Sequence, residues 1–105
     1  MQYDLLKNPV VAQAIKALQA GDKTQWFALF SEDAILFDDG REVNFHTFFD
    51  KAIGHEKFTR IDDVSDDGLE VYGHFHSDTW GNFNTYFKFT LHPTGKIIRL
   101  DIGQA

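Results

Sequence analysis

The second half of the chain alternates apolar and polar residues, and this alternation constrains the fold more than any other feature. Leu69, Val71 and Phe75 alternate with polar residues, and the same period of two recurs over 83–91 and 98–102. Such alternation is typical of antiparallel strands that have one face toward a core and the other toward water. The sequence therefore predicts a sheet that must be covered on one face only.

Three segments with helical spacing of apolar residues supply that cover. Asn8-Pro9 predicts the start of the first helix, with a capping side chain and a proline at the first helical position, and Gly21 predicts its end. Asp22 and Gln25 form the capping box of a second helix. Its expected buried residues are Trp26, Phe27, Leu29 and Phe30, and a third helix is expected over 45–53, before Gly54.

Two further strands are expected, one over 34–37 before the turn Asp38-Asp39-Gly40 and one over 58–64. The expected order is two helices, a strand, a helix and four antiparallel strands. This order predicts an α+β fold with three helices packed on the concave face of a strongly curved antiparallel sheet, a cone-shaped half-barrel. The 105 residues contain no repeat or linker, so we expect a single domain over 1–105.

Charge and composition exclude several classes of function. A net charge of −6 without a basic stripe argues against nucleic acid as a partner. The absence of cysteine excludes disulfide scaffolds, thiol catalysis and cysteine-based zinc sites. No apolar run approaches the length of a membrane span, and no signal-peptide pattern precedes the first helix. We therefore expect a cytoplasmic protein without membrane contact and without an organic cofactor.

Aromatic residues make up 15% of the chain, which indicates either a ligand cavity walled by rings or a close-packed aromatic core. Both interpretations stay open at this point, because a chain this short cannot keep every ring for a ligand. If a cavity forms, an apolar or aromatic small molecule is the expected partner. The residues expected to contact it are Trp26, Phe30, Phe49, Phe75, Phe87 and Leu100.

The element order, with the segments Phe30–Asp39 and Pro93–Arg99, resembles the nuclear transport factor 2-like superfamily, in particular its SnoaL-like and ketosteroid isomerase-like branch. The resemblance spans roughly the whole chain and implies the cone-shaped, cystatin-like fold. It also implies pairing of two chains through the convex sheet face. The superfamily includes isomerases, cyclases, dehydratases and non-catalytic binding domains, so fold alone does not choose an activity.

The resemblance can be carried over residue by residue. Asp38 matches the carboxylate that moves the proton in ketosteroid isomerases, and we predict it as the catalytic residue. Ala14 and Phe87 stand where that family has its oxyanion donors, and Phe30 and Phe49 replace the supporting tyrosines. Loss of these donors argues against steroid isomerisation, because stabilisation of the developing oxyanion is usually the largest catalytic contribution.

Asp38 has two interpretations. At the rim of a phenylalanine-lined cavity its pKa would be raised, and it would act as a base in a proton transfer, cyclisation or dehydration. It could instead be an exposed residue that only supports the Asp39-Gly40 turn. The protein would then be a non-catalytic interaction or accessory domain with a filled cone, and this alternative stays open beside the ligand-binding one.

Two polar clusters receive structural interpretations. His74, His76 and Asp78 could form a metal-ligand row. The next turn is expected at Gly81-Asn82, and a strict two-residue turn there would point both histidines inward. We favour an outward-facing polar row, because Leu69, Val71 and Phe75 occupy the other face. The acidic stretch 62–68 lacks the ligand spacing of a calcium loop and is expected to be a solvated turn. No metal is therefore expected. The outward residues expected at a homodimer interface are Tyr72, His74, His76, Asn84 and Tyr86.

Overall fold

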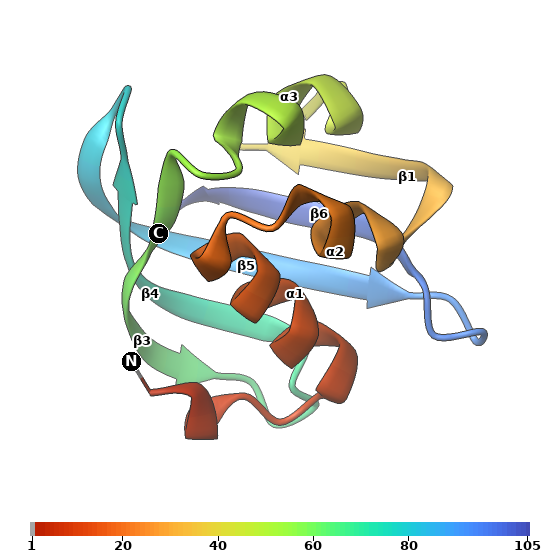
Figure 1. Cartoon of the computed structure of the whole chain (residues 1–105). Coiled ribbons are helices and arrows are strands. Elements are labelled where there is room, and N and C mark those ends of the chain that lie inside the picture. Colours follow the sequence, from red (N-terminus) through yellow and green to blue (C-terminus); the bar gives the residue numbers. More distant parts are fainter. Residues whose placement is uncertain (1) are drawn as a thin grey trace.

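Across residues 2–105, which the computed structural model describes, three α-helices lie on the concave face of one curved six-stranded sheet (Figure 1). The predicted α+β class and the half-barrel with its helical cover are confirmed. In chain order the elements are η1 (Tyr3–Leu5), α1 (Pro9–Ala20), α2 (Lys23–Ala28), β1 (Phe30–Asp38), β2 (Arg41–Val43), α3 (Phe45–Ala52), β3 (Glu56–Val64), β4 (Glu70–Ser77), β5 (Gly81–Leu91) and β6 (Ile97–Gln104).

The helix boundaries follow from local capping. The Asn8 side chain accepts hydrogen bonds from the backbone N–H groups of Val10 and Val11, and Pro9 occupies the first helical position of α1. Gly21 ends α1 in the left-handed conformation, with φ of 69°. Asp22 then caps α2 by accepting from the N–H of Gln25. The predicted starts of α1 and α2 are therefore confirmed at the level of single hydrogen bonds.

The strand order in the sheet is β2-β1-β6-β5-β4-β3, and it corrects two details of the prediction. β1 and β6 pair in parallel, so the sheet is antiparallel except at this one ladder. A short strand, β2, was also missed. It returns antiparallel to β1 through the two-residue loop Asp39-Gly40, in which both residues have positive φ. An Asp-Gly pair at such a loop is a strong hairpin signal, and it could have predicted β2.

Several element boundaries also differ from the prediction. Phe30 opens β1 opposite Ile97 and does not belong to α2, because the chain leaves the helix at Leu29, whose carbonyl accepts from Ile97 N–H. The turn between β4 and β5 lies over 78–80 and not at Gly81-Asn82, since Ser77 pairs with Gly81. This register keeps the odd residues of β4 on the concave face, as the alternation predicted.

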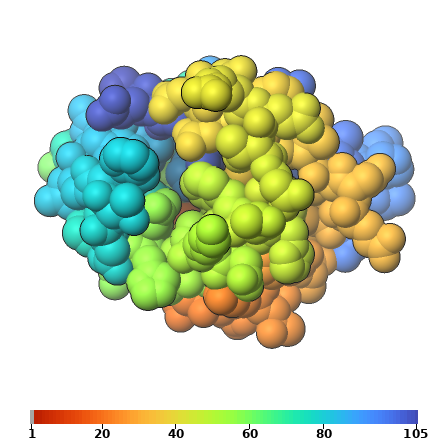
Figure 2. Space-filling model, turned by 90° about the horizontal axis from the view of Figure 1, so that it is seen from above, coloured from red at the N-terminus to blue at the C-terminus, as the bar shows by residue number. Residues whose placement is uncertain are grey.

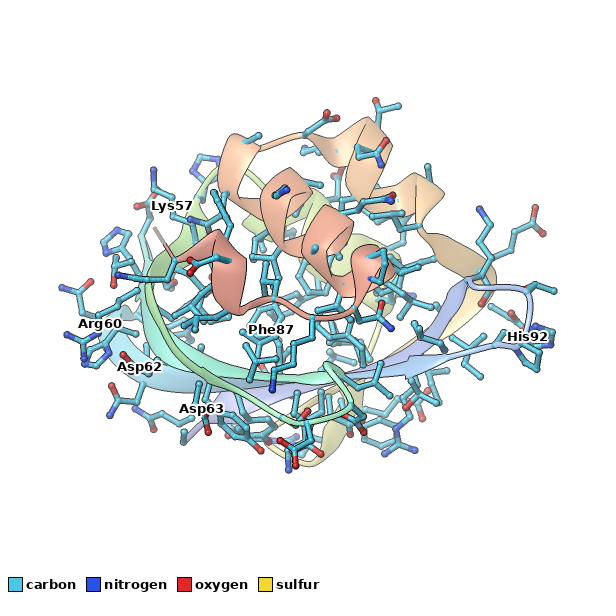
Figure 3. The ribbon with its side chains drawn as sticks, turned by 90° about the horizontal axis from the view of Figure 1, so that it is seen from below. Lys57, Arg60, Asp62, Asp63, Phe87 and His92 are labelled. Atoms are coloured by element: carbon cyan, nitrogen blue, oxygen red, sulfur yellow. The ribbon has the colours of Figure 1, made fainter. Side chains whose placement is uncertain are left out.

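The core lies between the concave face and the helices, and its narrow end is filled. Trp26 is fully buried there, with its ring centroid 4.9 Å from that of Phe30 and 4.6 Å from that of Phe49. Leu100 from β6 is also fully buried. Figure 3 shows Phe87 pointing from β5 toward the helices, whereas Arg60 and Asp62 project outward from β3.

None of the helices described over residues 2–105 combines the length and the apolar character that crossing a membrane requires.

Candidate functional site

A pocket of about 380 Å³ opens at the wide end of the cone, where β1, β4 and β6 end and β3 and β5 begin. Figure 2 shows the hollow between the β4–β5 hairpin, the region of α3 and the C-terminal end of β6. Such a volume suits a small organic molecule. Rings and carboxylates share the wall, which consists of Leu18, Asp38, Asp39, Phe48, Phe49, Glu56, Phe75, Trp80, Asn82, Phe83, Thr85, Phe87, Ile102, Gly103 and Gln104.

Asp38 is placed in the pocket wall by the last residue pair of the β1–β6 ladder, opposite Ile102. It is half-buried, and none of the residues 2–105 donates a hydrogen bond to its carboxylate. Burial raises its pKa above the ordinary carboxyl value, and the negative charge of neighbouring Asp39 raises it further. The pKa of Asp38 is thus shifted upward, as the sequence predicted for a residue at the rim of a cavity. Asp38 thus ends a strand beside a turn and also faces the cavity.

Glu56 is a second carboxylate in the same wall. It is the first residue of β3, directly after the turn that follows α3, and it is half-buried. Burial is the main cause that raises its pKa, and the charges of Asp38 and Asp78 add to it. The Ser77 hydroxyl opposes this shift because it donates a 2.9 Å hydrogen bond to Oε2 of Glu56. The pocket therefore contains two acids whose charged forms are both disfavoured.

Ser77 connects Glu56 to the hairpin at the pocket mouth. Its side chain is buried, and its oxygen accepts hydrogen bonds from the backbone N–H groups of Thr79 (3.2 Å) and Trp80 (3.1 Å). These bonds fix the loop that carries the Trp80 ring, which is 79% exposed although it lines the pocket. Trp80 therefore presents a large exposed aromatic surface at the pocket mouth.

The structure brings together about half of the predicted site. Asp38, Phe49, Phe75 and Phe87 line the pocket, and the three rings form its inner surface. The others lie in the filled narrow end of the cone, outside the pocket wall, and these are Trp26, Phe30 and Leu100. The rings therefore form a close-packed core at the narrow end of the cone and wall a cavity at its wide end, and ligand binding in that cavity stays a prediction.

Sequence reasoning missed several polar residues of the wall. Glu56 was missed because the strand was expected to begin at Phe58. Thr85 is buried on the concave face of β5, in the same alternation as Phe87, and its hydroxyl donates to the Gly103 carbonyl over 2.7 Å. Trp80 belongs to the loop that was placed two residues too late. The signal for Thr85 was present, since it follows the period of two between Phe83 and Phe87.

The polar row of β4 faces away from the pocket, on the convex side. His74 contacts Asp62 through Nδ1 at 2.9 Å, and His76 contacts Asn82 at 2.7 Å and Asp78 at 3.0 Å. The acidic stretch 62–68 ends β3 and forms a turn, in which Asp67 accepts from the Ser65 hydroxyl. In the described part of the chain, no three His, Asp or Glu residues are placed to hold one metal ion.

Comparisons with known proteins support the fold. No family model and no curated protein sequence matches the chain. Among solved structures, a candidate polyketide cyclase from Sinorhizobium meliloti has a TM-score of 0.76 at 18% identity, covering 97% of this chain and 99% of its own. A nuclear transport factor 2-like protein from Cytophaga hutchinsonii has a TM-score of 0.73 at 12% identity, covering 91% and 87%.

A third similar structure is part of a larger protein. The orange carotenoid protein of Anabaena (Nostoc) sp. PCC 7120, solved with bound canthaxanthin, has a TM-score of 0.72 at 24% identity. The match covers 91% of this chain but 35% of the carotenoid protein, so the chain spans about a third of that length. These similarities confirm the expected nuclear transport factor 2-like fold, which is also described as cystatin-like.

Proposed function

We propose that this protein binds an apolar or aromatic small molecule in the pocket at the wide end of the cone, and that Asp38 acts there as a base in a proton transfer. The observation that carries the proposal is a half-buried carboxylate without a hydrogen-bond donor, in the wall of a pocket of about 380 Å³. Structures with the same fold include one with a bound carotenoid and a candidate polyketide cyclase, which supports small-molecule binding.

The walls favour an apolar ligand with flat surfaces. Phe49, Phe75 and Phe87 lie on the inner side, and the ring centroids of Phe75 and Phe87 are 5.5 Å apart. Phe83 and Trp80 extend the aromatic surface to the mouth. Burial of a planar ligand among such rings removes apolar area from water and allows offset or edge-to-face ring contacts.

The chemistry available to Asp38 is proton abstraction from an acidic C–H bond of the ligand. Burial raises the pKa of Asp38 toward the range in which a carboxylate is an effective base at neutral pH. The electron pair of the broken C–H bond moves into the carbonyl-activated system of the ligand, and the carboxyl holds the proton, which then returns to carbon or exchanges with solvent. Isomerisation, cyclisation and dehydration each contain such a step.

Binding can be tested with an uncharged fluorescent dye such as Nile red. Saturable binding with one site per chain is expected, and the variant Gln104→Trp should abolish it by filling the pocket mouth from an exposed position. Thr90→Trp is the matched control, because it adds the same ring at an exposed position of β5 outside the pocket. Equal binding by both variants, or no saturable binding, would contradict the proposed pocket.

Proton transfer can be tested with a neutral aromatic ketone such as tetralone in deuterated water. The wild type should accelerate exchange of the protons next to the carbonyl group, measured by NMR, and Asp38→Asn should remove the acceleration while it preserves dye binding. Exchange that is equal in both proteins would show that Asp38 is not a base.

Binding without turnover is the second candidate, and one observation favours it. Thr85 carries the only hydroxyl group among the pocket-lining residues, and it donates to the Gly103 carbonyl instead of facing a ligand oxygen. Ala14, at the other expected donor position, is fully buried outside the wall. A developing oxyanion would then depend on the side-chain amides of Asn82 and Gln104 and on the Trp80 indole N–H, all at exposed positions, so the proton transfer would be slow. The deuterium-exchange experiment separates the two candidates.

We also propose that two copies of the chain pair through the convex face of the sheet. The cross-strand pairs Tyr72–Tyr86 and His74–Asn84 place a mixed aromatic and polar surface there, which is the composition enriched at interfaces. Sedimentation at micromolar concentrations should show a dimer that Tyr86→Asp disrupts, and a monomeric wild type would contradict this proposal. The cytoplasmic location stays a prediction.

A further inference from the structure

The pocket wall has a one-sided charge distribution. Its ionisable residues are Asp38, Asp39 and Glu56, and none of its residues is a lysine, an arginine or a histidine. The whole chain has a net charge of −6, so its overall field has the same sign. An anionic ligand would therefore have to enter against the field of the pocket and of the protein.

Two of these acids are half-buried and keep acceptor atoms that protein groups do not use. Asp39 differs from them because it is exposed to water, and its Oδ1 accepts from the Gln104 N–H over 3.0 Å. Glu56 uses Oε2 for the Ser77 hydroxyl, whereas Oε1 receives no hydrogen bond from residues 2–105. Both carboxylate oxygens of Asp38 also receive no hydrogen bond from the described residues. Half-buried acceptors without donors carry a cost that a donating ligand would remove.

The basic side chains beside the pocket do not neutralise it. Arg41 pairs with Asp38 across the β1–β2 ladder, but it does not line the pocket and is not among the groups that shift the pKa of Asp38. His55 affects Glu56 weakly, since it is the last of the causes that act on the pKa of that carboxyl. It belongs to the neighbouring groove beside α3, where its Nδ1 contacts Asp78 at 3.1 Å. Lys57, the next residue of β3, has its side chain on the opposite face of the strand and points outward in Figure 3.

We propose that the ligand is an aromatic molecule with a protonated amine, and that Glu56 is the residue that selects it, by accepting the ammonium group beside Asp38. The inference rests on the proposed binding function and deepens it by naming the ligand class. Rings from Phe75, Phe83 and Trp80 surround the same space, and aromatic faces attract cations as well as apolar groups. A cation also relieves the repulsion between Asp38 and Glu56.

Three probes that share one ring system test this assignment: naphthylmethylamine, naphthalenemethanol and naphthoate. They differ in charge and little in shape, so NMR chemical-shift titration of the pocket residues isolates the effect of charge. The expected order of affinity is amine, then alcohol, then carboxylate. We expect a difference of about tenfold or more between amine and carboxylate, because like-charge contacts are costly in partly buried sites.

The variant Glu56→Gln identifies the selecting residue. Glutamine keeps an oxygen that accepts from the Ser77 hydroxyl, so the fold and the hairpin should be preserved. Affinity for the amine should fall about tenfold, while affinity for the alcohol should change by less than about twofold. Asp63→Asn is the matched control, since it removes the same charge from an exposed position of β3 outside the pocket. It should leave the amine preference unchanged.

The outcomes separate this inference from the function on which it rests. Binding of the alcohol without a preference for the amine, or with stronger binding of naphthoate, overturns the assigned ligand class and leaves the pocket function intact. An amine preference that persists in Glu56→Gln overturns the role of Glu56. If none of the three probes shifts the pocket resonances, the proposed function and this inference both fail.

Discussion

The two ends of the cone use the same kinds of residue for different purposes. At the narrow end, Trp26 and Phe30 pack against each other with fully buried Leu100 beneath the helices, and none of the three lines the pocket. At the wide end, similar rings stand beside Asp38 and Glu56 around a hollow of about 380 Å³. The difference lies in what the rings face, which is other rings at one end and carboxylates at the other.

The comparison explains why a small domain can keep a cavity. One continuous hydrophobic cluster joins the helices to the sheet, and its tightest ring contacts, between 4.5 and 4.9 Å, involve Trp26, Phe30, Phe45 and Phe49. Stability gained from this packing allows the wide end to keep polar groups that are poorly satisfied. Substitutions at the two ends should therefore have separable effects on stability and binding.

The largest expected effect is the loss of stability in Trp26→Ala. The side chain is fully buried, and its removal should lower the free energy of unfolding by about 3–5 kcal/mol, as large-to-small core substitutions do. Phe83→Ala at the half-buried pocket wall should cost about 1 kcal/mol. Urea unfolding measures both. Equal losses would contradict the distinction between a packed end and an open end.

Trp26→Phe separates the packing of the Trp26 ring from the effect of its buried N–H group. The indole N–H of Trp26 is buried and has no hydrogen-bond partner among the described residues. Phenylalanine removes this unsatisfied donor but keeps a ring, so part of the packing loss should be offset. We expect a cost of less than about 2 kcal/mol in urea unfolding, well below that of Trp26→Ala.

Ser77→Ala should have the next largest effect, and it should reach the pocket. The substitution removes the hydrogen bond to Glu56 and two acceptor contacts with the hairpin loop, at a cost of about 1–3 kcal/mol. Because the Ser77 hydroxyl lowers the pKa of Glu56, that pKa should rise in the variant, as an NMR titration would show. Ser65→Ala, in the turn between β3 and β4, should destabilise the protein without changing the titration of Glu56.

The sequence was sufficient to predict the fold because period and capping are local signals. Alternation placed Val71, Phe75 and Phe87 on the concave face, and Asn8 and Gly21 delimited α1. The site was predictable in part. The family resemblance was enough to predict Asp38. Glu56 could not be predicted, because it is the first residue of a strand and reaches the pocket only through the packing of segments that are distant in sequence. Whether a ring faces other rings or a cavity depends on tertiary packing, which local patterns do not encode.

Asp38→Asn tests whether the half-buried carboxylate at the wide end destabilises the protein. Its expected effect on the free energy of unfolding is smaller than that of the preceding substitutions and opposite in sign, since the variant should be stabilised at neutral pH. The folded-state pKa of Asp38 is raised, so the native protein binds this proton more tightly than the unfolded chain does. The resulting stability is fully present below about pH 4, the ordinary carboxyl value, and is lost as pH rises through the folded-state pKa. The variant should therefore equal the wild type at acidic pH and match or exceed its stability at neutral pH.

Thermal unfolding of both proteins between acidic and neutral pH measures this difference. Asp39 acts on the pKa of Asp38, and Asp38, Asp78, His55 and Ser77 act on that of Glu56. Arg41 lies opposite Asp38 in the β1–β2 ladder. Asp63→Asn again serves as the control for loss of one exposed charge. An Asp38→Asn protein that is less stable than the wild type at neutral pH would show that the carboxylate is favourably held, and would remove the argument for a base.

Trp80→Ala should have the smallest effect on stability and a clear effect on binding. The ring is 79% exposed, so its removal should change the free energy of unfolding by less than about 0.5 kcal/mol. The loop itself is held by backbone bonds to Ser77, which the substitution leaves in place. Affinity for Nile red or an aromatic amine should nevertheless fall several-fold, because the ring lines the pocket mouth and would lie against a bound ligand. Thr79→Ala is the control, because Thr79 belongs to the same loop but lies outside this pocket. Equal ligand affinities for Trp80→Ala and the wild type would show that ligands bind only against the inner phenylalanines.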